Sequence, residues 1–207
     1  MKLEAEFYAR PTLDVAHDLI GKVLVRSRGR TTLAGRIVET EAYIGQDDLA
    51  CHASKGRTAR TEVMFGPPGR AYVYLIYGMY CCLNVVTERE GFAAAVLIRA
   101  IEPLDGLESM QRNRGRRLPG HEIGSGPGKL CQALGIDRRL NAASLLGSGL
   151  WIEEQGHEPG TVLVGARIGV DYAGAWRDKP WRFFMKDSPH VSKHGLNRAG
   201  AGRVARN

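Results

Sequence analysis

The sequence lacks the features that mark several classes of protein. It has four cysteines among 207 residues, and none of them forms a Cys-x-x-Cys pair or a spacing typical of a zinc site or a disulfide framework. No apolar stretch approaches the roughly 20 residues that a membrane-spanning helix needs. The first residues have no apolar core of the kind found in secretory signals. We therefore expect reduced thiols, no association with membranes, and a cytoplasmic location at the nucleoid, or a nuclear one if the source is eukaryotic.

Nucleotide-binding and nucleophile motifs are missing as well. There is no Gly-x-Gly-x-x-Gly run that opens a helix, no Walker loop, no Gly-x-Ser-x-Gly elbow and no His-Glu-x-x-His pair. We expect no cofactor and no metal.

Positive charge is in excess, with a net charge of +7. Arginines crowd residues 112–117, and further cations occupy the glycine-rich residues 193–207. Such clusters favour a polyanionic partner because binding releases counterions from phosphates. A merely solvated basic surface is the alternative.

The pattern of apolar residues predicts one α+β domain over residues 1–192, with a mainly antiparallel sheet, and a flexible basic tail at 193–207. A long connection, residues 45–70, is of a length that is usually functional. The expected helices span residues 11–20, 104–111 and 127–134, and the expected strands span residues 22–26, 33–44, 72–77, 80–87, 94–101, 150–153 and 166–170.

Residues 72–80 read as one arm and the bend of a β-hairpin, with Tyr77 and Met79 at the bend. Alternation puts Tyr72 and Tyr74 on one face of this arm. Large apolar side chains at a hairpin tip gain nothing there unless they insert into something, and in a basic protein a base step of DNA is a plausible target. Packing of the aromatic hairpin into its own core is the alternative.

Glu39, Glu41 and Tyr43 alternate along one strand, and the intervening residues face the other way. A carboxylate beside an aromatic ring could act as a general base, although an exposed strand face with a salt bridge is the alternative. Arg99 lies in an apolar strand and therefore needs a carboxylate partner, which Glu41 or Glu102 could supply. A pair with Glu41 would suit the activation of a water molecule, and a structural ion pair is the competing interpretation.

Three further residues are candidates for binding. Asn84 lies among apolar neighbours and could read the edge of a base, or tie down a backbone turn. His52 in the long connection could be a wall of a pocket, or have no special role. Lys129 follows Gly-Pro-Gly at the start of a helix and could hold one DNA phosphate.

Together these motifs resemble the alkyladenine (3-methyladenine, methylpurine) DNA glycosylase family. The resemblance runs from about residue 7 to residue 192. Its blocks are residues 36–43, 72–84, 97–104, 126–134 and the closing 181–192.

The resemblance implies a single α+β domain with a curved sheet, flanking helices and a protruding hairpin that inserts into DNA. It further implies a monofunctional hydrolase of base excision repair. Such an enzyme flips out alkylated or deaminated purines (3-methyladenine, 7-methylguanine, hypoxanthine, ethenoadenine) and cleaves the N-glycosidic bond with an activated water, leaving an abasic site. No lysine falls at the matched pocket positions, so no Schiff-base lyase step is expected. The partner would be damaged double-stranded DNA, and we expect a monomer.

The same resemblance assigns the residues that would contact DNA and the flipped base. Tyr77 would fill the gap left by the flipped nucleotide, with Met79 beside it. The flipped base would lie between Tyr43 on one side and His52 with Tyr74 on the other.

The resemblance also assigns the chemistry. Glu41 would be the general base for a water that Arg99 and the backbone carbonyl of Val191 also hold. Asn84 would collide with the exocyclic amine of normal guanine, and Lys129 would hold a phosphate.

Two other functions remain open from the sequence. A protein that binds lesions and flips bases without cutting would keep Tyr77 and the tyrosine walls but would not need Glu41 with Arg99. An RNA-binding module could use the same basic surface and aromatic strand.

Overall fold

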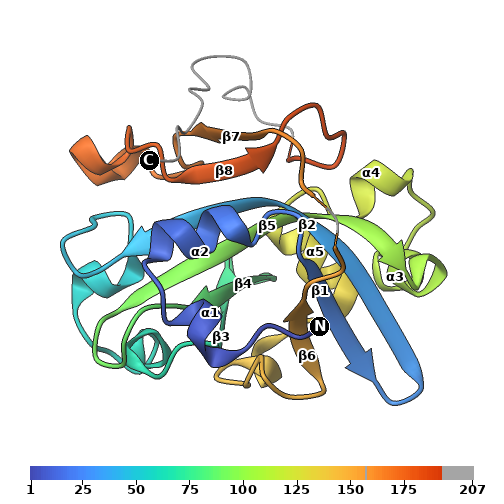
Figure 1. The fold of residues 1–207 in the computed structure, drawn as a ribbon, viewed down its shortest axis with the longest axis horizontal. Helices are drawn as coiled ribbons and strands as arrows, with labels where there is room; N and C mark the ends of the chain where they lie inside the picture. The colour runs from blue at the N-terminus through green and yellow to red at the C-terminus, as the bar shows by residue number, and fades with distance from the viewer. Residues whose placement is uncertain (157, 193–207) are drawn as a thin grey trace.

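The computed structural model describes residues 1–156 and 158–192, and the expected basic tail at 193–207 lies outside the described residues (Figure 1). An eight-stranded sheet runs through the molecule in the order β3-β4-β5-β2-β1-β6, while β8 pairs with β2 and β7 with β8. Every strand pair is antiparallel. The expected single α+β domain with a mainly antiparallel sheet is therefore confirmed.

The strands vary widely in length. They are β1 (Val23–Arg28), β2 (Thr31–Ile44), β3 (Ala71–Ile76), β4 (Tyr80–Val86), β5 (Ala94–Asp105), β6 (Leu150–Glu153), β7 (Val162–Gly165) and β8 (Arg182–Met185).

The helices are short and lie around this sheet, with α2 over its middle strands and α3 and α4 at one side (Figure 1). The α-helices are α1 (Ala5–Tyr8), α2 (Thr12–Asp18), α3 (Leu107–Asn113), α4 (Gly120–Ile123) and α5 (Pro127–Leu134), and the 3-10 helices are η1 (His52–Lys55), η2 (Glu62–Phe65), η3 (Arg138–Leu140) and η4 (Asp171–Trp176). Apolar residues from α2, α5 and the sheet share one large core. In the described part of the chain, no helix combines the length and apolar character needed to cross a bilayer.

Local sequence explains where several elements begin and end. The helix expected over residues 127–134 is confirmed, since Pro127 suits a first turn and Gly135 ends the helix in the left-handed region at φ 63°. The strand expected to end at residue 101 continues to 105, and the next helix begins only at Leu107. Gly106 separates the two at φ 75°, where a Cβ would come within 2.4 Å of the Leu33 side chain.

The strand expected over residues 166–170 is wrong, because the strand in this region is β7, which ends at Gly165. Residues 166–170 form an irregular segment in which the Ile168 amide donates to a carboxylate of β2. The sequence prediction also missed β8. Strand β8 completes the burial of β2 by pairing with Glu39 to Glu41 on the edge opposite β5.

The ladder between β2 and β5 is irregular where the charged residues meet. Its register shifts on both sides of Glu39, so Val38 and Arg99 fall outside the paired positions. The strict alternation expected along this strand is therefore wrong at Val38, which packs with Phe184 and Val191. The bulge sets Glu39 and Arg99 close together inside the sheet.

Candidate active site

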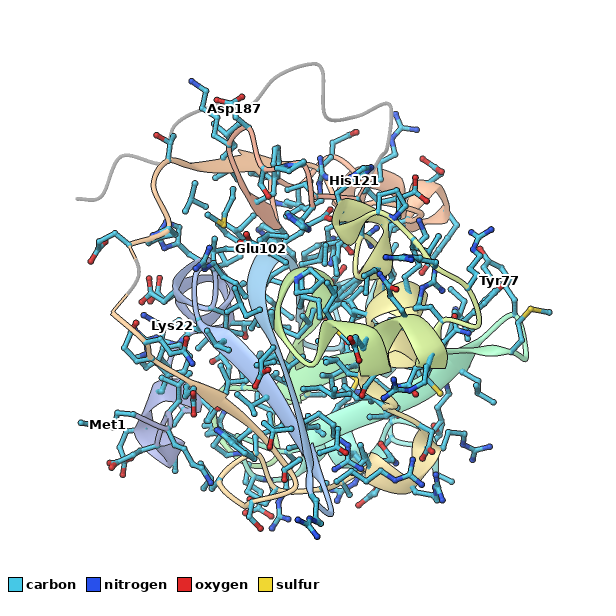
Figure 2. The ribbon with its side chains drawn as sticks, turned by 90° about the vertical axis from the view of Figure 1, so that its right-hand side faces the viewer. Met1, Lys22, Tyr77, Glu102, His121 and Asp187 are labelled. Atoms are coloured by element: carbon cyan, nitrogen blue, oxygen red, sulfur yellow. The ribbon has the colours of Figure 1, made fainter. Side chains whose placement is uncertain are left out.

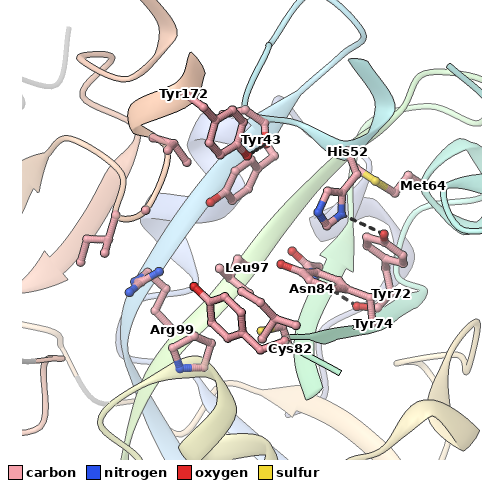
Figure 3. Close-up of a pocket in the computed structure, with 17 residues that line it drawn as sticks. Tyr43, His52, Met64, Tyr72, Tyr74, Cys82, Asn84, Leu97, Arg99 and Tyr172 are labelled. Atoms are coloured by element: carbon pink, nitrogen blue, oxygen red, sulfur yellow. Dashed lines mark hydrogen bonds between the residues drawn. The ribbon is translucent and has the colours of Figure 1, made fainter. Parts of the chain in front are cut away.

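A cavity opens beside strands β2, β3, β4 and β5 (Figure 3). Its volume of about 270 Å³ is close to the lower limit for small-ligand pockets, which is about 300 Å³. Its lining is mostly aromatic and apolar, with few polar groups. The lining residues are Tyr43, Ala50, His52, Met64, Tyr72, Tyr74, Ile76, Tyr77, Cys82, Asn84, Leu97, Arg99, Pro127, Ile168, Gly169, Val170 and Tyr172.

Aromatic rings form two facing walls of the cavity. Tyr43 from β2 stands across the space from His52 and Tyr72 (Figure 3). The His52 ring meets the Tyr74 ring edge-on with centroids 4.5 Å apart, and its Nδ1 lies 3.0 Å from the Tyr72 hydroxyl. The alternation expected along β3 is confirmed, because Tyr72 and Tyr74 both face this side while Val73 enters the main core. The structure thus brings Tyr43, His52 and Tyr74 around one space.

His52 is neutral at neutral pH. The pKa of His52 is lowered to about 4, mainly by burial in the aromatic wall and to a smaller extent by the positive charge of Arg60. The wall therefore presents an uncharged imidazole to the cavity.

Glu41 lies behind the lining of the cavity and is fully buried. Its Oε2 accepts hydrogen bonds from the Tyr43 hydroxyl at 2.8 Å and from Arg99 Nη1 at 3.2 Å, and its Oε1 accepts from the Ile168 amide at 2.7 Å. Tyr43 and Arg99 also line the cavity, so they connect it to the carboxylate. The expected ion pair between Arg99 and Glu41 is therefore present in the structure.

Arg99 has a second carboxylate partner that differs from the one expected. Its Nε donates to Glu39 at 3.1 Å, whereas Glu102 pairs with Arg36 at 2.7 Å. Burial opposes the charge of Arg99, but the nearby Glu41 and Glu39 outweigh burial and raise the pKa of Arg99 above its usual value. Arg99 therefore stays charged inside the sheet.

Tyr43 stays protonated for related reasons. Burial and then the charge of Glu41 raise the pKa of Tyr43 well above its usual value. Its hydroxyl can therefore donate to Glu41 at neutral pH.

Glu39 ties the strand to the end of the described chain. Besides Arg99, it accepts from Arg182 Nη1 at 3.0 Å and from the Ser192 amide at 2.9 Å. The bond to Ser192 fixes the backbone directly after Val191, which is 8% exposed and lies outside the lining of the cavity. In the sequence, only the Glu-x-Glu alternation pointed to Glu39 as a site residue. That pattern could not show that Glu39 links β2 to Arg182 and Ser192.

A second buried ion pair supports the Tyr43 wall. Arg167 and Asp48 are fully buried side chains joined by two hydrogen bonds of 2.6 and 2.8 Å. The guanidinium lies against the Tyr43 ring at 4.7 Å and the Trp181 ring at 5.0 Å. Sequence reasoning missed both residues, because they are far apart in the chain and follow no motif.

Asn84 is one of the few polar residues that line the cavity. It is 4% exposed, and its Nδ2 donates to the Tyr72 carbonyl at 3.2 Å. The backbone tie expected as an alternative is therefore present together with the place in the cavity. Met64 and Tyr172, two further lining residues, carried no signal in the sequence.

The bend between β3 and β4 projects from the body of the molecule (Figure 2). Tyr77 and Gly78 have positive φ of 52° and 70°, and the Met79 amide donates to the Ile76 carbonyl at 3.2 Å, which is the pattern of a tight hairpin turn. Tyr77 is 82% exposed and Met79 67%. The hairpin tip therefore does not pack into its own core.

Lys129 stands exposed in the first turn of α5. This turn packs against the hairpin, because a Cβ at Gly128 would lie 3.1 Å from the Tyr80 side chain. Lys129 therefore lies beside the second arm of the hairpin.

Metal-binding clusters are absent from residues 1–156 and 158–192, where no three His, Cys, Asp or Glu side chains are grouped as a metal site requires. The four cysteines are free thiols, three of them buried.

A family model and several curated proteins match this chain over most of its length. The family model described as methylpurine-DNA glycosylase matches residues 6–189. Three relatives, each named "Putative 3-methyladenine DNA glycosylase", come from Methanocella arvoryzae (59% identical, 92% of this chain and 96% of the relative), Alkaliphilus oremlandii (50%, 93% and 100%) and Myxococcus xanthus (53%, 92% and 93%). The chain belongs to the methylpurine-DNA glycosylase family.

Proposed function

We propose that this protein is a monofunctional DNA glycosylase of base excision repair. It flips an alkylated or deaminated purine out of duplex DNA, hydrolyses the N-glycosidic bond with a water molecule and leaves an abasic site. The observation that carries this proposal is the aromatic cavity whose lining residues Tyr43 and Arg99 both hydrogen-bond to the buried Glu41.

The hairpin accounts for binding to DNA. Tyr77 enters the minor groove and fills the gap left by the flipped nucleotide, while Met79 presses beside it. Lys129, next to the hairpin, holds a phosphate. The net charge of +7 favours the same partner. We expect the protein to act on chromosomal DNA as a monomer.

The cavity accounts for the choice of base. Aromatic faces attract cations, as many alkylated purines are, and stacking tolerates a range of base shapes. Damaged bases also cost less to extrude than paired normal ones. Asn84, fixed by its bond to the Tyr72 carbonyl, stands where the exocyclic amine of normal guanine would collide. The pocket thus rejects guanine by shape and accepts other purines.

The buried carboxylate accounts for the chemistry. Cleavage of the bond builds positive charge on the sugar, and Glu41 stabilises that charge and takes a proton from the attacking water. A carboxylate offers about four lone-pair positions. Three are used by Tyr43, Arg99 and Ile168, which leaves one for the water. Arg99 and the carbonyl of Val191 hold the same water.

The described lining of the cavity offers no lysine amine for a lyase step. Such an amine would form a Schiff base with the sugar. The abasic product is therefore released with an intact strand.

An alkali assay tests the proposal. A duplex with one hypoxanthine or ethenoadenine is incubated with the protein, and half of each sample is then treated with alkali. We expect strand breaks at the lesion only after alkali. Breaks without alkali would contradict the monofunctional mechanism, and no breaks under either condition would indicate a protein that binds lesions without cutting.

A further inference from the structure

Both aromatic walls of the cavity have an arginine against them that is not part of the lining. The Arg167 guanidinium lies 4.7 Å from the centre of the Tyr43 ring. On the opposite wall, the Arg60 guanidinium lies 5.1 Å from the centre of the Tyr74 ring. A flipped base between these walls would therefore lie between two guanidinium groups.

The two arginines differ in how their charge is balanced. Arg167 is joined to Asp48 by two hydrogen bonds, so this pair adds almost no net charge. Arg60 is exposed; its Nη2 lies 3.5 Å from His52 Nε2, and its guanidinium also interacts with the Tyr72 hydroxyl. Among the described residues, no carboxylate lies within ion-pair distance of Arg60. Arg60 thus brings an unbalanced positive charge to the wall of Tyr74 and His52.

An unbalanced cation at this place changes what the cavity prefers. The electron-rich face of a tyrosine attracts cations, and the Arg60 guanidinium already makes a cation–π contact with the Tyr74 ring. A cationic base stacked beside this wall would also be repelled by the guanidinium, whereas a neutral base would not. The aromatic walls favour cationic purines, and Arg60 reduces that advantage.

We propose that Arg60 is a specificity-determining residue that shifts the preference of this pocket from cationic N-alkylated purines toward neutral lesions such as hypoxanthine. The proposal rests on the proposed glycosylase function and assigns one residue the balance between two classes of its substrates. Arg60 acts on the base through the charge it places on the wall, without entering the cavity.

The charge of Arg60 also affects the protonation of the His52 ring. The groups that face its ring are Arg60, the hydroxyl of Tyr72 and the ring of Tyr74. Burial and Arg60 lower the pKa of His52 to about 4. Loss of the Arg60 charge should therefore raise the pKa of His52 toward its ordinary value.

Arg57 provides a matched control in the same connection between β2 and β3. It is also an exposed arginine, but its guanidinium is paired with Glu62 through hydrogen bonds of 2.7 and 2.8 Å, and it lies over Phe65 instead of a cavity wall. Arg57→Gln and Arg60→Gln each remove one positive charge from the protein. Only Arg60→Gln removes it from the aromatic wall.

The test compares single-turnover release of 7-methylguanine, which is cationic, and hypoxanthine, which is neutral, from otherwise identical duplexes. Arg60→Gln should raise the ratio of the two rate constants by about three- to tenfold, the size expected for one partly screened charge. Arg57→Gln should leave the ratio unchanged, and Arg60→Lys, which keeps the charge, should stay near the wild-type ratio. An equal ratio in Arg60→Gln and Arg57→Gln would overturn the inference.

Titration of His52 by NMR provides a readout that does not depend on base release. Its pKa should rise above the wild-type value of about 4 in Arg60→Gln and not in Arg57→Gln. An unchanged pKa in Arg60→Gln would show that its charge does not reach the wall and would overturn the inference. A wild-type protein that releases neither base would instead reject the proposed function, and the NMR titration would still test the charge at the wall.

Discussion

Glu41 is a carboxylate held in the interior of the sheet by three donors that differ in kind: a phenol, a guanidinium and a backbone amide. A buried charge is stable only when it is paired and hydrogen-bonded, and Glu41 meets both conditions. Two of these donors, Tyr43 and Arg99, also line the cavity, so the carboxylate is held directly behind the cavity wall.

Replacement of Glu41 by glutamine tests its role as the base. Glu41→Gln keeps the size and one acceptor oxygen but removes the charge, so base release should fall by at least ~100-fold while lesion binding persists. Single-turnover kinetics and a gel-shift titration measure the two effects. Glu102→Gln, which removes a partly exposed carboxylate paired with Arg36, should retain wild-type release. Normal turnover by Glu41→Gln would remove Glu41 from the mechanism.

Asn84 is the residue whose shape should exclude normal guanine. Asn84→Ser shortens a side chain that lines the cavity, so release of guanine from undamaged DNA should rise by about tenfold, in the range by which pocket shape discriminates. Release of hypoxanthine by the same variant provides the control and should change little. If the guanine rate stays at background, the steric explanation is wrong.

At the scale of elements, the two ends of the hairpin of β3 and β4 lie in different surroundings. Its base carries Tyr72, Tyr74 and Asn84 into the cavity, and its tip exposes Tyr77 and Met79. An apolar tip that is exposed in the free protein indicates a partner that covers it.

Tyr77→Ser tests whether the tip inserts into DNA. The variant should bind lesion-containing duplex about 10- to 100-fold more weakly, since stacking on a base contributes about 1–3 kcal/mol. Its thermal stability should be unchanged, because the side chain is 82% exposed. Leu146→Ser removes another exposed apolar side chain, in the segment that pairs with Gly69 at the opposite end of the hairpin, and should not weaken binding. Undiminished affinity of Tyr77→Ser would show that the hairpin is no wedge.

At the scale of the whole molecule, buried ion pairs hold the irregular segments onto the sheet. Asp48 in the loop after β2 and Arg167 in the segment after β7 meet at the Tyr43 wall. Glu39 likewise joins β2 to β8 and to the segment at Ser192. The walls of the cavity therefore depend on contacts between distant parts of the chain.

Asp48→Asn measures this dependence. The substitution leaves Arg167 buried without a carboxylate, so the free energy of unfolding should fall by about 3–5 kcal/mol. Denaturant titration followed by fluorescence measures the loss. Glu62→Gln breaks an ion pair that is exposed, and it should leave the midpoint of unfolding unchanged. Equal midpoints for Asp48→Asn and the wild type would show that the buried pair does not stabilise the fold.

The sequence predicted most of the strands and part of the cavity lining, and local signals carried several of these predictions. Alternation along β3 and β2 put the tyrosines and carboxylates on shared faces, and a lone arginine among apolar residues required a partner. The sequence could not predict β8 or the irregular segment at Ile168. Both are held by contacts with β2, which local sequence patterns do not reveal.

The amino-acid order by itself determined which chemistry the protein carries: an acid in a strand, tyrosines at alternating positions and an apolar hairpin bend. The tertiary structure alone decided which partners these groups have. Arg99 pairs with Glu39 as well as Glu41, Glu102 turns to Arg36, and Arg167 supports Tyr43 from far along the chain. Ion pairs form between side chains that folding brings within a few ångströms, and separation along the sequence does not fix that distance.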